Sequence, residues 1–416
     1  MTSDFWKICY AESIYILSSR ILIAIITLYF LNSDSVWLSS CFLFFYFTSK
    51  SVFGIFLAHK FEKLEKKRIL TQLILLFIGV SLLTIIVKST SVSSLIFIFI
   101  FIFISVGIGF IDSFFTPVVN AFIPAIVDNT LIDEAFRKIF LIQALNNLFG
   151  IAIGMAGYGS IGFTNMIWVI IVSALISLII LISLNNKGRS FSSSEEKISG
   201  NNIKNSMAIF ISYRFEPWWA FFSMIINMFL APFSSFVIPY FIVNVAGNNP
   251  IMIGLIEGCA AAGAIFSSCY FQKKIELVIG RAQSVILSFW TIGLCFLLLS
   301  FINHIFIWSI LTFIMGMAIV MNNVSVESCR SVAIPEKNRV KIQTIHNAFI
   351  GAGNPLGLLF IPFIIKNYGS MTALIISAVI IIIAAVFVRF IPLFHELLTC
   401  RQEDISNLYE KKYGDL

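Results

Sequence analysis

The sequence predicts an all-α integral membrane protein in which twelve transmembrane helices form two six-helix bundles. Hydrophobic residues make up 59% of the 416 residues and charged residues only 12%, whereas about a quarter of a soluble domain is charged. The apolar residues lie in runs of about 20 residues, the length that crosses a bilayer as a helix. Short polar or basic segments separate these runs, so the chain is expected to cross the membrane repeatedly.

The orientation follows from the positive charges. With both termini in the cytoplasm, 23 of the 28 Lys and Arg residues fall in cytoplasmic segments, and only Lys88 and Lys366 fall on the opposite side. The other three, Arg20, Lys50 and Arg389, lie within or at the edge of apolar segments. This distribution obeys the positive-inside rule and predicts a multi-pass protein of the cytoplasmic (inner) membrane with both termini cytoplasmic. The expected spans are 13–32, 36–58, 69–87, 92–118, 139–159, 165–185, 217–243, 251–271, 283–302, 305–328, 343–365 and 370–392.

A Ser- and Asn-rich linker divides the chain. Residues 186–206 are charged and lack an apolar period, which is typical of a flexible tether. We therefore expect one six-helix bundle in residues 1–185, the linker in 186–206, a second six-helix bundle in 207–392 and a cytoplasmic tail with a short helix in 393–416.

The two predicted bundles are also related in sequence. Residues 143–149 read QALNNLF and residues 343–349 read QTIHNAF, with Gln, Asn and Phe at matching places. Each stretch opens the fifth crossing of its bundle, after a basic loop that contains proline. A parallel repeat of six plus six helices is how one large class of transporters is built.

Four stretches of the chain form recognisable motifs: PVVNAFIPAIV at 117–127, NMFLAP at 227–232 with Pro239-Tyr240 after it, PEKNRV at 335–340 and NPLGLL at 354–359. In these stretches the chain resembles the major facilitator superfamily, and more narrowly its drug:proton antiporter branch, which holds macrolide efflux proteins and siderophore exporters. Two motifs depart from the family pattern. The loop motif after the second helix, Gly54 to Lys60, has one extra residue and His59 where Asp is usual. The antiporter motif of the fifth helix lacks its Pro.

The resemblance implies a secondary active exporter that works by alternating access. Protons moving inward would drive a macrolide-like antibiotic, a siderophore or a peptide antibiotic outward, giving resistance or self-immunity. A proton-coupled importer of a small nutrient or siderophore is the alternative, and a membrane enzyme or sensor without transport is the third. The implied partners are the lipid bilayer, a small-molecule or peptide substrate and protons, and we expect a monomer.

Three charges lie at membrane depth, where each costs at least ~2.5–3.5 kcal/mol at a helix centre. Arg20 belongs to the first crossing, Lys50 to the second and Asp112 to the fourth. The family fold implies that helices 1 and 4 face a central cavity, so an ion pair of Asp112 with Arg20 or Lys50 is expected. Asp112 would either carry the coupling proton or form a permanent ion pair that locks the bundle.

Other acidic and basic residues allow the same two kinds of interpretation. Glu257 stands alone in an apolar helix, as a second proton site or as a neutral carboxyl bonded across a helix pair. Further charged residues lie near cytoplasmic helix ends, where interfacial charges are expected and a gate network is the alternative. These are Glu216, Glu327, Arg330 and His346.

Polar and aromatic residues of helices 7 and 10 are candidates for the substrate cavity. Asn227, Asn322 and Asn323 carry amides that need partners in hydrocarbon, which makes them ligand groups or braces between helices. Trp218 lies near the start of helix 7, as a cavity residue or as an interfacial anchor.

Small residues on two helices predict a helix-packing seam. GxxxG spacing lets helix backbones approach closely, and the family fold implies that helices 5 and 8 meet across the two halves. The seam would be either a sliding surface for alternating access or ordinary tight packing. Its expected members are Gly150, Gly154, Gly157, Gly254 and Gly258.

The missing motifs exclude several classes of protein. The chain has no GxxxxGK[ST] loop for ATP and no HExxH or GxSxG motif. It has four His and no CxxC pair among its Cys residues, so we expect no enzyme activity, no catalytic residue, no metal and no cofactor. Topology explains the net charge of +7, so no nucleic-acid partner is expected.

Overall fold

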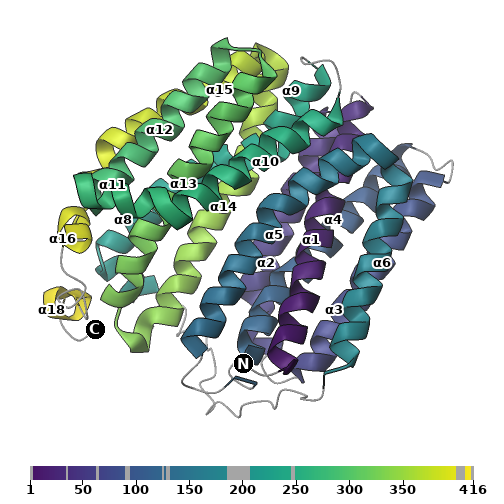
Figure 1. Cartoon of the computed structure of the whole chain (residues 1–416), viewed down its shortest axis with the longest axis horizontal. Coiled ribbons are helices and arrows are strands. Elements are labelled where there is room, and N and C mark those ends of the chain that lie inside the picture. Colours follow the sequence, from purple (N-terminus) through teal and green to yellow (C-terminus); the bar gives the residue numbers. More distant parts are fainter. Residues whose placement is uncertain are drawn as a thin grey trace. The chain divides into compact units, whose positions relative to one another are not determined.

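A computed structural model describes residues 3–33, 36–61, 65–89, 94–123, 126–127, 132–184, 207–244, 249–399 and 408–413 (Figure 1). Throughout these residues the regular elements are helices. A helix pairs its own backbone N–H and C=O groups, which is what lipid requires of a spanning segment. The chain divides into two compact units. Unit 1 comprises Met1–Glu196 and Ile238–Leu255, and unit 2 comprises Lys197–Val237 and Ile256–Leu416.

Unit 1 is built around α1 (Ser3–Asn32). This helix packs along α5 (Ile132–Ile161) and α6 (Phe163–Ile182), which run beside it in Figure 1, and it also contacts α2, α4 and α9 (Ile238–Asn244). The other close pairs join α2 (Val36–Phe61) to α4 (Ser94–Phe122), and α3 (Lys66–Ser89) to α4 and α6. Because α1 is covered on several sides, its polar side chains must find partners inside the bundle.

Unit 2 contains two main helix layers of its own. The helix α8 (Phe215–Pro232) packs along α14 (Glu336–Tyr368), and α12 (Arg281–Phe301) packs on α13 (Ile305–Ala333) and α15 (Ser370–Val388). Pro232 ends α8, and a π-helical stretch (Phe233–Val237) follows it, as expected where a proline disturbs the regular hydrogen-bond ladder. The boundary between the units falls within α10 (Pro250–Phe266), whose residues from Ile256 onward belong to unit 2. The remaining elements of unit 2 are η4 (Ser267–Phe271), α11 (Gln272–Ile279), α16 (Phe394–Thr399) and α18 (Leu408–Tyr413).

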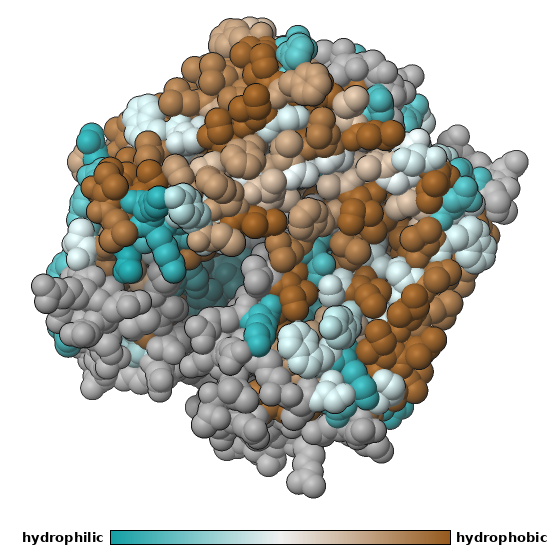
Figure 2. Space-filling model, in the orientation of Figure 1, coloured by the Kyte–Doolittle hydropathy of each residue, from teal (hydrophilic) through white to brown (hydrophobic). Residues whose placement is uncertain are grey.

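Ten helices among the described residues are long and apolar enough to cross a membrane. The helices α2 and α5 are not among these ten, so the number twelve stays a prediction, as do the predicted domain boundaries. Figure 2 shows apolar residues along the outward face of α6, where Trp168, Val172 and Ile179 are exposed. Such a face suits contact with lipid rather than with water.

Several helices extend beyond their expected ends. The first expected span begins at residue 13, but α1 begins at Ser3; the eleventh begins at 343, but α14 begins at Glu336. Hydropathy ends a predicted span at the first charged residues, whereas the helix continues through them because their side chains find partners. The expected short tail helix is present as α16 and α18. Both contribute buried residues, among them Leu397, Leu398 and Tyr409, to the core of unit 2.

Glycines permit the close packing of α8 on α14. A Cβ added to Gly357 would lie 1.8 Å from the Met228 carbonyl oxygen, and one added to Gly353 would lie 2.3 Å from the Met224 carbonyl oxygen. Both distances are too short for two heavy atoms that are not bonded to each other. The two helix backbones therefore approach as closely as glycine allows.

Replacement Gly357→Ala should therefore lower the free energy of unfolding by about 1–3 kcal/mol, because the methyl group forces α8 and α14 apart. Gly258→Ala in α10 is the matched control, since a Cβ there meets no described atom within 4 Å. Thermal unfolding of the two purified variants in detergent measures the difference. Equal unfolding temperatures for the two variants would contradict the tight α8–α14 contact.

Candidate functional site

A buried polar network in unit 1 is centred on Asp112 of α4. Its Oδ1 accepts hydrogen bonds from the Tyr15 hydroxyl at 2.5 Å and from the Ser19 hydroxyl at 2.9 Å, both on α1. Its Oδ2 accepts a bond from the Tyr46 hydroxyl of α2 at 2.6 Å. The carboxylate therefore ties three helices together and is almost fully enclosed, with Asp112 8% exposed.

Arg20 neutralises this carboxylate. Its Nη2 lies 3.5 Å from Asp112 Oδ2, and its Nη1 donates to the Tyr46 hydroxyl at 2.6 Å. Lys50, one turn after Tyr46 on α2, is near enough to interact electrostatically with both Arg20 and Asp112. The structure thus brings the three predicted membrane charges together, with Arg20 as the direct partner. Three hydroxyl donors and a guanidinium favour an anion that stays ionised.

A second carboxyl of unit 1 is Glu12, which the sequence analysis missed. It is 1% exposed and accepts a hydrogen bond from the Gln143 side chain of α5 at 2.8 Å. The expected first span begins one residue after it, at residue 13, so hydropathy places Glu12 outside the membrane. The sequence signal for Glu12 is Gln143 of the repeat, because a polar side chain in the fifth crossing needs a polar partner on a neighbouring helix.

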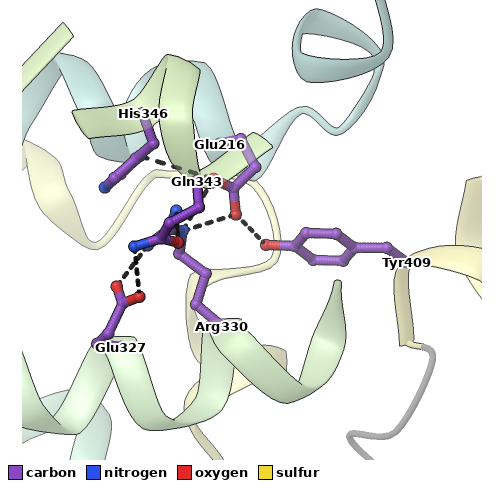
Figure 3. A network of polar contacts seen from close by, with 6 residues as sticks. All are labelled: Glu216, Glu327, Arg330, Gln343, His346 and Tyr409. Atoms are coloured by element: carbon purple, nitrogen blue, oxygen red, sulfur yellow. Dashed lines mark hydrogen bonds and ion pairs between the residues drawn. The ribbon is translucent and has the colours of Figure 1, made fainter. Parts of the chain in front are cut away.

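The larger network of unit 2 is centred on Arg330 of α13 (Figure 3). Its Nε donates to both oxygens of Glu216 at 3.0 and 2.9 Å, and Nη2 donates to the Gln343 side-chain oxygen at 2.9 Å. Nη1 forms an ion pair with Glu327, whose other oxygen accepts from Gln343 Nε2 at 2.9 Å. One guanidinium thus joins α8, α13 and α14.

Tyr409 of the tail completes this network. Its hydroxyl donates to Glu216 Oε1 at 3.0 Å, and its ring contacts that of Tyr213 with centroids 5.0 Å apart. Burial and the neighbouring Glu216 carboxylate raise the pKa of the Tyr409 hydroxyl well above its ordinary value, so it remains a donor. Burial alone would lower the pKa of the Arg330 guanidinium, but Glu216 and Glu327 outweigh it and raise that pKa.

Glu216, Glu327, Arg330 and His346 were expected to be interfacial charges. That interpretation is wrong for three of these four residues. Glu216 and Arg330 are fully buried and His346 is 2% exposed, with His346 Nδ1 3.6 Å from Glu216 Oε2. Charges are buried together because each guanidinium or carboxylate supplies the other's missing hydration. The structure therefore groups them in one network, as the alternative of a gate network requires.

Glu257 of α10 lies in a separate part of unit 2. It is 4% exposed, and its Oε1 accepts a hydrogen bond from the Ser234 hydroxyl of the π-helical stretch η3 (Phe233–Val237) at 2.9 Å. No Lys or Arg among the described residues forms an ion pair with it. This geometry fits both interpretations of Glu257, the proton site and the hydrogen-bonded neutral carboxyl.

The four cavity candidates have different surroundings. Asn322 is buried, and its Oδ1 has no hydrogen-bond partner among the described residues, whereas Asn323 is exposed and Asn227 is half-buried. Trp218 lines an apolar pocket of about 490 Å³ with residues of α8 and α15, including Phe221 and Phe387. Trp218 thus lies beside apolar residues. Asn322 is the candidate whose amide oxygen has no hydrogen-bond partner among the described residues.

The expected glycine seam is divided among several contacts. Added Cβ atoms at Gly150 and Gly154 would meet α1, at 2.5 Å from Arg20 Cβ and 3.0 Å from Ala24 Cβ. Gly157 faces Met166 of α6, and a Cβ at Gly258 meets no described atom within 4 Å. Only Gly254, 2.8 Å from the Ala152 carbonyl oxygen by the same measure, meets the predicted partner helix. Of the five glycines, Gly150 and Gly154 thus face α1 and Gly157 faces α6, and a seam formed by all five stays a prediction.

The remaining predicted residues lie at the limit of the described structure. Gly54 and Lys60 of the loop motif belong to the last turns of α2, and the surroundings of these two residues lie outside what the structure describes. Within the described residues, no group of three or more His, Cys, Asp or Glu side chains is arranged to hold a metal ion.

Comparisons with known proteins agree with the helical architecture. Residues 220–396 match the model of the Major Facilitator Superfamily, and a search of curated proteins finds no significant match. A mutant of the nucleoside transporter NupG aligns with a TM-score of 0.72 and 11% identity over 95% of this chain and 100% of its own. A mutant of the peptide transporter POT gives 0.72 and 12%, over 95% of each chain. A POT family transporter in complex with a thioalcohol-conjugated peptide gives 0.69 and 13%, over 95% and 96%. At such identities the likeness establishes the fold, which is that of these transporters.

Replacement Arg330→Met should lower the free energy of unfolding by about 3–5 kcal/mol, because it leaves Glu216 buried without its counter-charge. Arg389→Met is the control, since Arg389 lies exposed beside the Phe390 ring. Thermal unfolding in detergent compares the two, and Arg330→Met combined with Glu216→Gln should recover part of the loss. An Arg330→Met protein as stable as Arg389→Met would refute the network's structural role.

Proposed function

We propose that this chain, which has the fold of major facilitator transporters, is a secondary active exporter. It moves a drug-sized toxic compound or natural product out of the cell in exchange for protons, by alternating access, and lies in the cytoplasmic membrane with both termini in the cytoplasm. The observation that carries the proposal is the fold, which matches solved transporters over 95% of the chain. The Major Facilitator Superfamily match over residues 220–396 supports it from the sequence side.

The direction and the cargo rest on the resemblance to efflux proteins in four sequence stretches. The candidate cargoes are macrolide-like antibiotics, siderophores and peptide antibiotics. A proton-coupled importer of a small nutrient is the second candidate, because the similar solved structures include a nucleoside transporter and a transporter in complex with a peptide conjugate. Both candidates use an ion gradient, since the sequence offers no P-loop for ATP.

The polar networks suit such a mechanism because each makes its own group of helices rigid. In unit 1 Asp112 accepts from α1 and α2 while lying on α4, and in unit 2 Arg330 joins α8, α13 and α14. We therefore take Asp112 and Arg20 as a permanent lock and leave Glu257, which has no charged partner among the described residues, as the proton-coupling candidate of unit 2. A rigid unit can change its orientation as a whole without exposing its buried charges.

Expression in a drug-sensitive bacterial host tests transport and its direction. The exporter hypothesis predicts a several-fold higher inhibitory concentration for at least one compound in a panel of macrolides, siderophore conjugates and peptide antibiotics. A protonophore at a sub-inhibitory dose should remove this difference, since it collapses the driving gradient. Cells with the empty vector are the control. Greater sensitivity of the expressing cells, reversed by the protonophore, would instead identify an importer.

Replacement Asp112→Asn separates the lock from a proton carrier. If Asp112 is a lock, the variant leaves Arg20 buried without its anion and should lose about 3–5 kcal/mol of stability. Asp112→Asn combined with Arg20→Met should recover part of that loss, measured by thermal unfolding. A single variant that is fully stable, yet transports only down a concentration gradient of the cargo, would mean that Asp112 carries the proton.

A further inference from the structure

Glu12 is a buried carboxyl whose hydrogen-bond partners are all neutral side chains. Its Oε1 accepts from Gln143 Nε2 at 2.8 Å, while its Oε2 is buried and has no hydrogen-bond partner among the described residues. No described Lys or Arg lies within ion-pair distance. A carboxylate in this position would keep a full negative charge away from water with neutral donors alone, the Gln143 amide and the Thr116 hydroxyl, which is strongly unfavourable. A carboxylic acid avoids that cost.

The groups around Glu12 come from the helices that pack on α1. Cys9 lies one turn before it on the same helix, Thr116 lies beside it from α4, and Gln143 reaches it from α5. Lys138 of α5 acts electrostatically on Cys9, and its Nζ lies 5.5 Å from the centroid of the Trp6 ring.

The other neighbouring helices bring no charge to Glu12. The α6 helix contributes the Ser177 hydroxyl, which donates to the Ala11 carbonyl oxygen at 2.8 Å. Residues Ile238–Asn244 of α9 include no charged side chain. The polar residues Tyr46 and Lys50 of α2 interact with Arg20, which lies two turns further along α1, and with Asp112 of α4.

A related position in unit 2 shows the contrast. Glu216 opens α8, which packs along α14 as α1 packs along α5, and Gln143 and Gln343 occupy matching places in the repeat. Glu216 receives two bonds from Arg330 and one from Tyr409. Glu12 has only neutral partners, the Gln143 amide and the Thr116 hydroxyl. The same architecture thus holds one carboxylate with a permanent cation and leaves the other without one.

We propose that Glu12 is a proton-binding site of unit 1. Hydronium transfers its proton to Oε2, where an O–H bond forms and water is left, while Gln143 continues to donate to Oε1. The proton returns to water when α1 and α5 move enough to admit it. The role of this site in transport rests on the proposed proton-coupled function. The protonation of Glu12 itself does not depend on the cargo.

Infrared spectroscopy of the purified protein tests the proposal without a substrate. The wild-type spectrum minus that of Glu12→Gln should contain a carboxylic-acid C=O stretching band at neutral pH. That band should shift in deuterium oxide and disappear reversibly as the pH is raised. Glu257→Gln is the matched control at the other carboxyl without an ion pair, and it should leave the Glu12 band in place. Asp112→Asn should remove no such band, since Asp112 is ionised.

Two results would overturn the proposal. The first is the absence of an acid band in the Glu12→Gln difference spectrum, which would mean that Glu12 is ionised. The second is a band that persists at every pH at which the protein stays folded, which would mean that the proton never leaves. Should Glu12→Gln fail to fold, Gln143→Leu provides the readout, since loss of its hydrogen bond must move the frequency of a protonated Glu12. An unchanged band in a folded Gln143→Leu protein would count against the site. The infrared measurements need no substrate, so a negative result in the resistance assay would not change how they are interpreted.

Discussion

A charged group inside a spanning helix is stabilised by partners within the protein, because hydrocarbon offers none. This constraint explains why the buried charges of the chain occur in groups. Asp112 satisfies its two oxygens with three hydroxyls and a guanidinium, and Arg330 distributes its donors over Glu216, Glu327 and Gln343. The helices that carry these residues are then fixed against one another, so the requirement for satisfaction also determines which helices belong together.

The sequence was informative where a single residue differs in charge or polarity from its neighbours along the chain. A charge in an apolar run is conspicuous, and Arg20 and Asp112 could be expected to meet because both lie in the cytoplasmic half of helices that the family fold brings together. The apolar runs likewise located the described spanning helices, with ends that differ by up to about ten residues. Both inferences use properties that a residue and its near neighbours carry by themselves.

The sequence was less informative where the decisive partner is distant. Glu12 looked like the polar end of a helix, since a hydropathy profile contains the charge but not the Gln143 side chain that receives it. Glycine spacing on α5 defines a smooth face but not the helix that covers it, and α1 and α6 cover most of it. Tyr409 lies in a short polar segment whose local sequence contains nothing about Glu216, 193 residues earlier.

The attachment of α18 to α8 has a practical side for anyone preparing this protein. Trimming a membrane protein after its last spanning segment is a routine step before crystallisation, and here the residues beyond Val388 look expendable by composition. Cutting there would strip the cover from Glu216 and admit solvent to the guanidinium behind it. A shortened chain that behaves poorly in detergent would then reflect a damaged interior and not an intrinsically fragile protein.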